Sequence, residues 1–251
     1  MKLYDLGEQY YSNGDYQKAL ETFTKIYESE KNDDALNYMG CCLMHLGYFS
    51  DALIVFDKVI EANPKWERPI MNKGRIYLKL KDYKKAMPLF KKAIELNPEN
   101  EDVLYYMGLY YERLGDYEKA KLNYRKALLI NPIQPETRIN LGNIYYRLGN
   151  FEAAKQEFEI TYAQNNNFFD ALINIGLVNC ELEKYDEAIK CLKNVLQHLP
   201  NDLGVMYDLA WVYFKQSEFQ KSLIIIEKIL NKDPQNELGI RLKREIEAKK
   251  K

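Results

Sequence analysis

The residues of this chain best suited to chemistry are two histidines and four cysteines, and their spacing gives no catalytic arrangement. Cys41 and His45 are one helical turn apart and could share a metal ion, but a site with two ligands on one helix binds weakly without further ligands. His198 lies in no recognisable nucleophile or metal motif. The carboxylates are plentiful and offer no distinctive pair for acid and base roles. We therefore expect no catalytic site, no cofactor, no metal and no enzymatic activity.

Small residues at a fixed interval reveal the elements that would position any binding residues. Glycine recurs every 34 residues, at Gly40, Gly74, Gly108, Gly142 and Gly176, and Ala210 continues the series. A second small residue follows twelve positions after each of them, at Ala52, Ala86, Ala120, Ala154, Ala188 and Ser222. This period predicts one supersecondary unit repeated along nearly the whole chain as a solenoid.

The segment 135–168 indicates how one repeat folds. Leu141 and Tyr145 lie at helical spacing on one face, and Gly149 is placed to end that helix in the left-handed conformation. Asn150 can cap a second helix directly afterwards. The two helices should form an antiparallel hairpin, in which the repeated small residues let the two backbones approach closely.

Residues at fixed repeat positions carry a resemblance to a known family. Over residues 1–236 the chain has Gly or Ala at position eight, Tyr at eleven, Tyr or Phe at seventeen, Ala at twenty, Phe near twenty-four and Pro at thirty-two. It thereby resembles the tetratricopeptide repeat family. The resemblance implies an all-α fold, a right-handed superhelical solenoid of antiparallel helix pairs, with the first helix of each pair, helix A, lining the concave side. The expected repeats are 1–32, 33–66, 67–100, 101–134, 135–168, 169–202 and 203–236.

Several positions depart from this pattern. Lys81 and Glu183 replace the cap glycine, and Asn179 replaces the tyrosine of helix A. We expect looser packing around residues 165–183. Pro88 lies deep in the second helix of its repeat, so it should kink that helix or delay its start.

The register fails after Asn236, and residues 237–251 are predicted to form an amphipathic capping helix. Leu238, Leu242 and Ile246 form its apolar stripe, which should cover the last repeat. Its basic end, Lys249 to Lys251, is explained by solvation and the helix dipole, or else by contact with an acidic partner.

The resemblance also implies which helix A residues face the groove. They are unusually apolar and aromatic in the fourth to seventh repeats, which suggests an apolar binding surface. These residues are Tyr105, Tyr106, Leu109, Ile139, Ile173, Leu177, Tyr207, Trp211 and Phe214. The predicted partner-binding set also includes the polar residues Asn72, Asn140, Asn143, Asn174, Arg113 and Arg147.

Two features of this surface allow alternatives. Trp211 could anchor a peptide as a large amphipathic ring, or it could pack against a neighbouring helix or the capping helix. Asn72, Asn140 and Asn174 share the sixth repeat position, where an amide could bond an extended peptide backbone, but Tyr106 interrupts the series.

Charged rows flank the predicted groove. Basic residues stand at position thirteen, namely His45, Lys79, Arg113, Arg147 and Lys215, and acidic residues at position two, namely Asp34, Asp102, Glu136 and Asp170. The rows could grip a charged peptide, or they could simply complement the dipole of each helix A. A clamp for a terminal carboxylate is not expected, since the first repeats supply Tyr4, Glu8 and Tyr38 where its polar and basic residues would stand.

Composition limits the remaining classes. Lys and Arg number 36 against 37 Asp and Glu, a formal net charge of -1, so bulk attraction to nucleic acid or anionic lipid is not expected. No run of 18 apolar residues occurs, and Asp5 and Glu8 interrupt any signal-peptide core, so we expect a cytoplasmic protein that does not insert into membranes. The cysteines have no zinc or redox spacing and should be reduced thiols.

The sequence thus favours a non-catalytic adaptor that binds a peptide or partner helix in the groove, without a small-molecule substrate. Two alternatives remain open: RNA binding through the basic row, and a self-assembling structural subunit. The oligomeric state is open as well.

Overall fold

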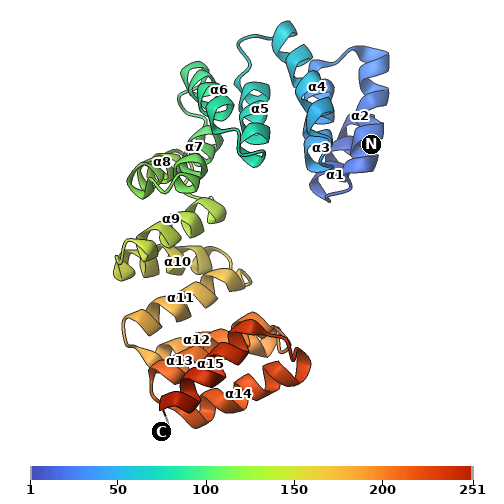
Figure 1. Cartoon of the computed structure of the whole chain (residues 1–251). Coiled ribbons are helices and arrows are strands. Elements are labelled where there is room, and N and C mark those ends of the chain that lie inside the picture. The colour runs from blue at the N-terminus through green and yellow to red at the C-terminus, as the bar shows by residue number, and fades with distance from the viewer. Residues whose placement is uncertain (1, 250–251) are drawn as a thin grey trace. The chain divides into compact units, whose positions relative to one another are not determined.

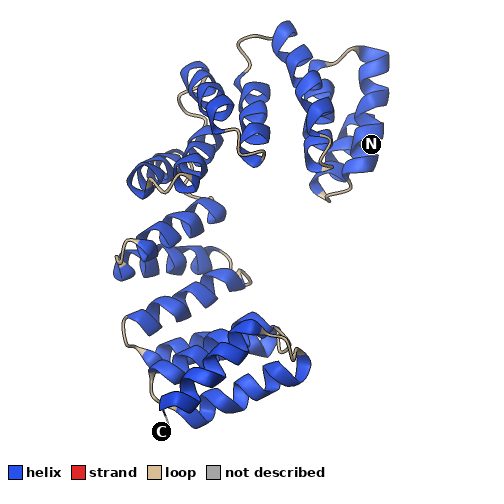
Figure 2. Cartoon of the chain, in the orientation of Figure 1, coloured by secondary structure: helices blue, strands red, loops and turns tan. Residues whose placement is uncertain are grey.

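The computed structural model describes residues 2–249, and this part of the chain contains fifteen α-helices and no strand (Figure 2). The contacts divide the chain into two compact units, Met1–Asn131 and Pro132–Lys251. Within each unit, consecutive helices pack as hairpins joined by short turns (Figure 1). The expected all-α class is confirmed.

The first unit contains eight helices. They are α1 (Leu3–Ser12), α2 (Tyr16–Glu30), α3 (Asp33–His45), α4 (Phe49–Ala62), α5 (Glu67–Lys79), α6 (Tyr83–Leu96), α7 (Glu101–Arg113) and α8 (Tyr117–Ile130). Besides the hairpin contacts, α3 contacts α5, and α5 contacts α7. Helices α3, α5 and α7 therefore lie side by side.

The second unit contains seven helices. They are α9 (Pro135–Arg147), α10 (Phe151–Gln164), α11 (Phe169–Glu181), α12 (Tyr185–His198), α13 (Leu203–Lys215), α14 (Phe219–Lys232) and α15 (Glu237–Lys249). Here α11 contacts α13, and α13 contacts α15. The division of residues 1–236 into seven repeats stays a prediction, since the contacts divide the chain differently.

The repeated glycines Gly40, Gly74, Gly108 and Gly142 of the A helices each accommodate a ring from the following helix. A methyl group on Gly108 would lie 2.4 Å from Cε1 of Tyr124, and one on Gly40 or Gly74 would lie 2.6 Å from Cε1 of the matching phenylalanine. Distances this short exclude any side chain at these glycines. The small residue thus makes room for a buried ring at position twenty-four, in addition to bringing two backbones together.

The turns within the hairpins keep their geometry where glycine is missing. Lys81, Glu183 and Ser217 have φ of 60°, 59° and 65°, close to the 76° of Gly115. The left-handed conformation is therefore imposed by the hairpin, at a steric cost to residues with a Cβ atom.

Pro88 does not delay its helix, contrary to one of the two expected effects. Helix α6 begins at Tyr83, the same repeat position at which α8 begins at Tyr117, and Pro88 lies inside it. The first turns of α6 form before the proline is reached, and Asp82 caps them by accepting a hydrogen bond from the Lys85 backbone N–H.

The segment predicted to be loosely packed contributes a well-buried helix. Helix α11 places Leu172, Ile175 and Val178 in the core of the second unit. The defect is local: the Oδ1 atom of Asn179 is buried without a hydrogen-bond partner. Asn179 stands where other repeats carry tyrosine. This substitution leaves a buried polar atom without a hydrogen bond, while the helix around it stays well packed.

Helix α15 packs against α13 and α14, and its buried face differs from the predicted stripe. Leu242 and Ile246 are buried as expected, but Leu238 is 53% exposed and Gly239 is buried instead. The helix begins at Glu237, 34 residues after α13 begins, so it starts where another helix A would start. The Nζ of Lys249 lies 4.7 Å from the ring centroid of Phe214, whereas the predicted basic residues Lys250 and Lys251 lie outside the described residues.

Candidate partner-binding site

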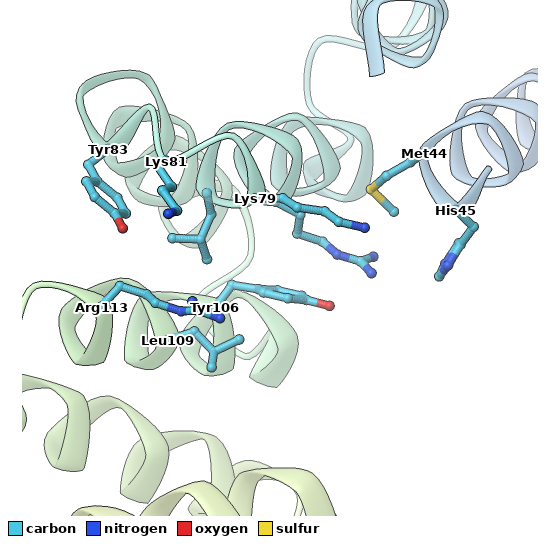
Figure 3. Close-up of a pocket in the computed structure, with 10 residues that line it drawn as sticks. Met44, His45, Lys79, Lys81, Tyr83, Tyr106, Leu109 and Arg113 are labelled. Carbon is cyan, nitrogen blue, oxygen red and sulfur yellow. The ribbon is translucent and has the colours of Figure 1, made fainter. Parts of the chain in front are cut away.

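A pocket of about 460 Å³ opens in the first unit between α3, α5 and α7. It is lined by Met44, His45, Arg75, Leu78, Lys79, Lys81, Tyr83, Tyr106, Leu109 and Arg113. Figure 3 shows Tyr106, Leu109 and Arg113 projecting from α7 toward α5, with Met44 and His45 approaching from α3. Three of the predicted groove residues therefore meet in one cavity.

Helical spacing explains why these side chains converge. Tyr106, Leu109 and Arg113 are three and four residues apart on α7, and such residues share one helical face. Arg75 and Lys79 are likewise four residues apart on α5. Because α3, α5 and α7 lie side by side, their exposed faces form one continuous lining.

Arg75 is held in a fixed orientation. Its Nη1 donates a hydrogen bond to Oδ1 of Asn72 at 2.8 Å, and its guanidinium carbon lies 4.7 Å from the ring centroid of Tyr106. Asn72 in turn donates from Nδ2 to Sγ of Cys41 at 3.3 Å. The guanidinium is thus restrained both by a hydrogen bond and by a cation–π contact.

Asn72 itself is only 3% exposed, and both ends of its amide are used inside the protein. This differs from the expectation that the amide is free to bond a peptide backbone. Its observed role is to position Arg75.

The cations of the pocket lack carboxylate partners. Arg75, Lys79, Lys81 and Arg113 form no ion pair with any described residue. Other lysines of the same unit do: Lys73 pairs with Asp57, Lys85 with Asp82, Lys119 with Asp116 and Lys121 with Glu118. The pocket therefore gathers four cations that no carboxylate of the described residues neutralises.

The electrostatic effect of these cations is visible at His45. Partial desolvation, followed by the charges of Arg75 and Lys79, lowers the pKa of His45. Its ring stacks on Tyr16 with centroids 4.3 Å apart. At neutral pH His45 is therefore an uncharged, aromatic part of the pocket wall.

Tyr106 links the pocket to the core. Its ring lies parallel to that of Phe90, with centroids 6.2 Å apart, and burial raises the pKa of its phenol to about 12. Tyr105 contacts it edge-on at 5.0 Å and is half-buried, but does not line the pocket.

The second unit carries the other predicted site residues on α9, α11 and α13. Arg147 is exposed, and eight are half-buried: Ile139, Asn140, Asn143, Ile173, Asn174, Leu177, Tyr207 and Trp211. Ile139, Ile173 and Trp211 pack against the core cluster built by α10 to α13. Part of this apolar surface thus stabilises the unit itself.

Trp211 packs internally, which is one of its two predicted roles, and its role as a peptide anchor stays a prediction. It packs against the cluster that includes Leu242 and Ile246 of α15, and its ring lies 5.4 Å from that of Phe214. It nevertheless stays partly exposed, and Lys215 lies 5.9 Å from its ring centroid. Phe214, in contrast, is only 7% exposed and belongs to the core.

Some members of these surfaces were not expected from the sequence. Met44, Leu78 and Tyr83 also line the pocket, and no helical spacing indicated them, because Met44 and Leu78 directly precede His45 and Lys79 and Tyr83 follows the turn at Lys81. Asp208 was also missed. It is half-buried at the sixth repeat position, forms no hydrogen bond or ion pair with a described residue, and burial followed by the charge of Asp202 raises its pKa to about 6.

Cys41 and His45, a weak metal pair that the sequence disfavours, belong to no larger ligand group in the described residues. Among residues 2–249, no group of three or more His, Cys, Asp or Glu side chains could hold a metal ion. Burial raises the pKa of the Cys41 thiol to about 11, so that it stays protonated at neutral pH. None of the helices in the described part of the chain is long and apolar enough to cross a bilayer.

Both units are built from consecutive helical hairpins, and family models agree with this architecture. Models described as "Tetratricopeptide repeat" match residues 4–65, 70–100, 89–121, 139–189 and 181–246, and one described as "TPR repeat" matches residues 111–149. This chain belongs to the tetratricopeptide repeat family, whose fold is a protein–protein interaction module.

Individual relatives are similar over different extents. Superkiller protein 3 of Schizosaccharomyces pombe is 36% identical over 63 residues, which are 25% of this chain and 4% of that protein. The chain therefore spans a small fraction of this relative's length.

Solved structures share the fold at low sequence identity. YrrB, described as a TPR protein with an unusual peptide-binding site, matches with a TM-score of 0.65 and 22% identity over 75% of this chain and 97% of its own. The structure of the APC/C hetero-tetramer Cut9-Hcn1 matches with a TM-score of 0.76 and 15% sequence identity. The match covers 96% of this chain and 48% of that chain. PilF of Pseudomonas aeruginosa matches with a TM-score of 0.74 and 16% sequence identity. The match covers 85% of this chain and 97% of that chain.

Proposed function

We propose that this protein is a non-catalytic cytoplasmic adaptor that holds a peptide or helix of a partner protein against its A helices. The observation that carries the proposal is the pocket between α3, α5 and α7, where Tyr106 and Leu109 offer apolar area beside hydrogen-bond donors. Cavities of this kind, apolar with a few convergent polar groups, are typical binding sites. Affinity would come mainly from burying aromatic and aliphatic side chains.

The family and its structural neighbours support this proposal. YrrB is described by a peptide-binding site, and Cut9 by its assembly with Hcn1. In the second unit, the partly exposed ring of Trp211 and the neighbouring Tyr207 offer a further apolar contact for a partner.

The test is selection from a random peptide library on the immobilised full-length protein. We expect enriched peptides, and we expect Tyr106→Ala with Leu109→Ala to abolish their retention. Leu122→Ala is the matched control, because Leu122 is 52% exposed on α8 and lies outside this pocket. A second pair, Tyr105→Ala with Trp211→Ala, tests the wider predicted surface. Retention that survives both pairs, with helicity intact by circular dichroism, would refute the assignment of these surfaces.

RNA binding is the second candidate, favoured by the gathering of His45, Lys79 and Arg113 in one pocket. Binding through phosphates weakens steeply as salt rises, whereas an apolar peptide site changes little. A salt titration of any ligand obtained therefore separates the two candidates.

A further inference from the structure

We propose that the pocket between α3, α5 and α7 binds an anionic side chain, a carboxylate or a phosphate, on a peptide segment that carries a large apolar residue beside it. The inference rests on the proposed function and specifies the chemistry of the peptide that this site selects.

The pocket lining carries an excess of positive charge. It contains four permanent cations and no carboxylate, although the whole chain has a net charge of -1. Asp102 is electrostatically coupled to Arg75 but forms no ion pair with it. Clustered cations repel one another, and an incoming anion relieves that repulsion while gaining charge-assisted hydrogen bonds.

The side chain of Arg75 is already oriented before a ligand binds. Asn72 accepts one of its hydrogen bonds and the Tyr106 ring packs on its face, so the guanidinium is oriented before any ligand arrives. No other acceptor among the described residues engages its remaining N–H groups. A restrained donor loses little conformational entropy on binding, which strengthens the interaction.

The aliphatic side chains of the lining favour a peptide over RNA as the carrier of the anion. Met44, Leu78 and Leu109 are aliphatic members of the lining and suit an apolar side chain next to the anionic one. Sequence-tolerant RNA binding instead requires exposed aromatic faces on which bases stack. Here Arg75 already covers the ring of Tyr106, and Phe90 lies parallel to that ring.

The experiment uses the full-length protein and four pools of short peptides, blocked at both ends so that no terminal charge contributes. The pools share a random mixture of neutral residues and differ at one central position, which is Glu, phosphoserine, Gln or Lys. Fluorescence anisotropy measures their binding. We expect the Glu or the phosphoserine pool to bind at least about tenfold more tightly than the Gln and Lys pools, and the difference between the two anionic pools identifies the source of the anion.

Variants assign the effect to this pocket. Arg75→Gln with Lys79→Gln should weaken binding of the preferred anionic pool about tenfold and leave the Gln pool unchanged. Lys91→Gln with Lys92→Gln removes the same charge from exposed positions of α6 outside the pocket, and should have no effect. Because Arg75 also supports Tyr106, a second pair, Lys79→Glu with Arg113→Glu, changes only exposed side chains and should abolish the anion preference without unfolding the protein.

Each contrary outcome is distinct. Binding of the Gln pool equal to that of both anionic pools, with all binding lost in Tyr106→Ala/Leu109→Ala, overturns the anion inference and leaves the proposed peptide function standing. If none of the four pools binds, both the anion inference and the proposed peptide binding at this site are refuted. Tighter binding of single-stranded oligouridine than of any peptide pool, lost in the charge variants, would assign the pocket to RNA and overturn the inference.

Discussion

The ring of Phe158 lies against the α-carbon of Gly142, so that a methyl group on Gly142 would be 2.4 Å from Cε1 of the ring. Phe158 is 1% exposed and belongs to the core of the second unit, so its ring is closely surrounded. Where the ring is replaced by Leu192, the matching glycine, Gly176, has a looser contact of 3.1 Å. In the next hairpin Ala210 replaces the glycine, and the side chain at position twenty-four is Ile226. The size of one residue thus sets the size allowed to the other.

Gly142→Ala should destabilise the protein by about 2 kcal/mol, because overpacking a fixed ring outweighs the gain in helix propensity. Urea unfolding followed by circular dichroism measures the effect. Gly176→Ala is the matched control and should be close to neutral. Adding Phe158→Leu to Gly142→Ala should recover part of the loss, and equal losses at Gly142 and Gly176 would contradict the steric explanation.

Replacing residues in the left-handed turns by glycine should stabilise the protein. Glu183→Gly and Ser217→Gly should each raise the free energy of unfolding by about 1 kcal/mol, since both residues have positive φ and are exposed. Gly149→Ala, at φ of 75° with open space around its α-carbon, should lower it by a similar amount, about 1 kcal/mol. Thermal melting of the three variants tests the expected rise in stability for the two glycine substitutions and the expected fall for Gly149→Ala. A melting temperature lowered by either glycine substitution would show that other contacts hold these turns.

Asn179→Leu should raise stability by about 1 kcal/mol, because it removes a buried Oδ1 atom that has no hydrogen-bond partner. Other repeats carry tyrosine at this position, for example Tyr145, so the hairpin tolerates a larger side chain there. The contrasting variant is Asn72→Leu, which breaks two hydrogen bonds and should be destabilising. Chemical denaturation of both variants tests the contrast, which fails if the two substitutions shift the midpoint in the same direction.

Asp208 should make stability depend on pH. Its pKa is raised to about 6 in the folded protein, from the ordinary value of about 4 in the unfolded chain, so the folded state binds the proton more tightly. Its contribution to stability is therefore complete below pH 4 and is lost as the pH rises through 6.

Asp208→Asn should accordingly stabilise the protein at pH 7.5 by about 1 kcal/mol, with the advantage vanishing toward pH 4. Melting temperatures across this range give the profile. Asp34→Asn, at an exposed position of α3, is the matched control for the loss of one carboxylate. A constant difference between Asp208→Asn and the parent at every pH would exclude titration of this carboxyl as the cause.

The sequence predicted those parts of the fold that depend on local periodicity. The 34-residue spacing of glycines from Gly40 to Gly176 led to the helical hairpins, and Leu242 and Ile246 led to the buried face of α15. The side chains that fill the space beside each glycine required the structure, because Gly142 and Phe158 come from different helices. Asn72 shows the limit for the site: its repeat position suggested exposure, whereas the structure buries it beneath Arg75.

The pocket was predictable only in part for the same reason. Tyr106, Leu109 and Arg113 lie on one helix, so helical spacing alone grouped them. Their convergence with Arg75 and Lys79 depends on how α5 lies beside α7, a tertiary contact that no short-range pattern encodes.

Helix α15 has a consequence for polymerisation. It covers Ile226 and Ile229 of α14, and it turns Glu237, Arg241 and Arg244 toward water. A second molecule could pack on this face of α14 only after displacing α15, which therefore blocks association through Ile226 and Ile229. Deleting residues 237–251 should expose these two residues and increase concentration-dependent association, measured by sedimentation.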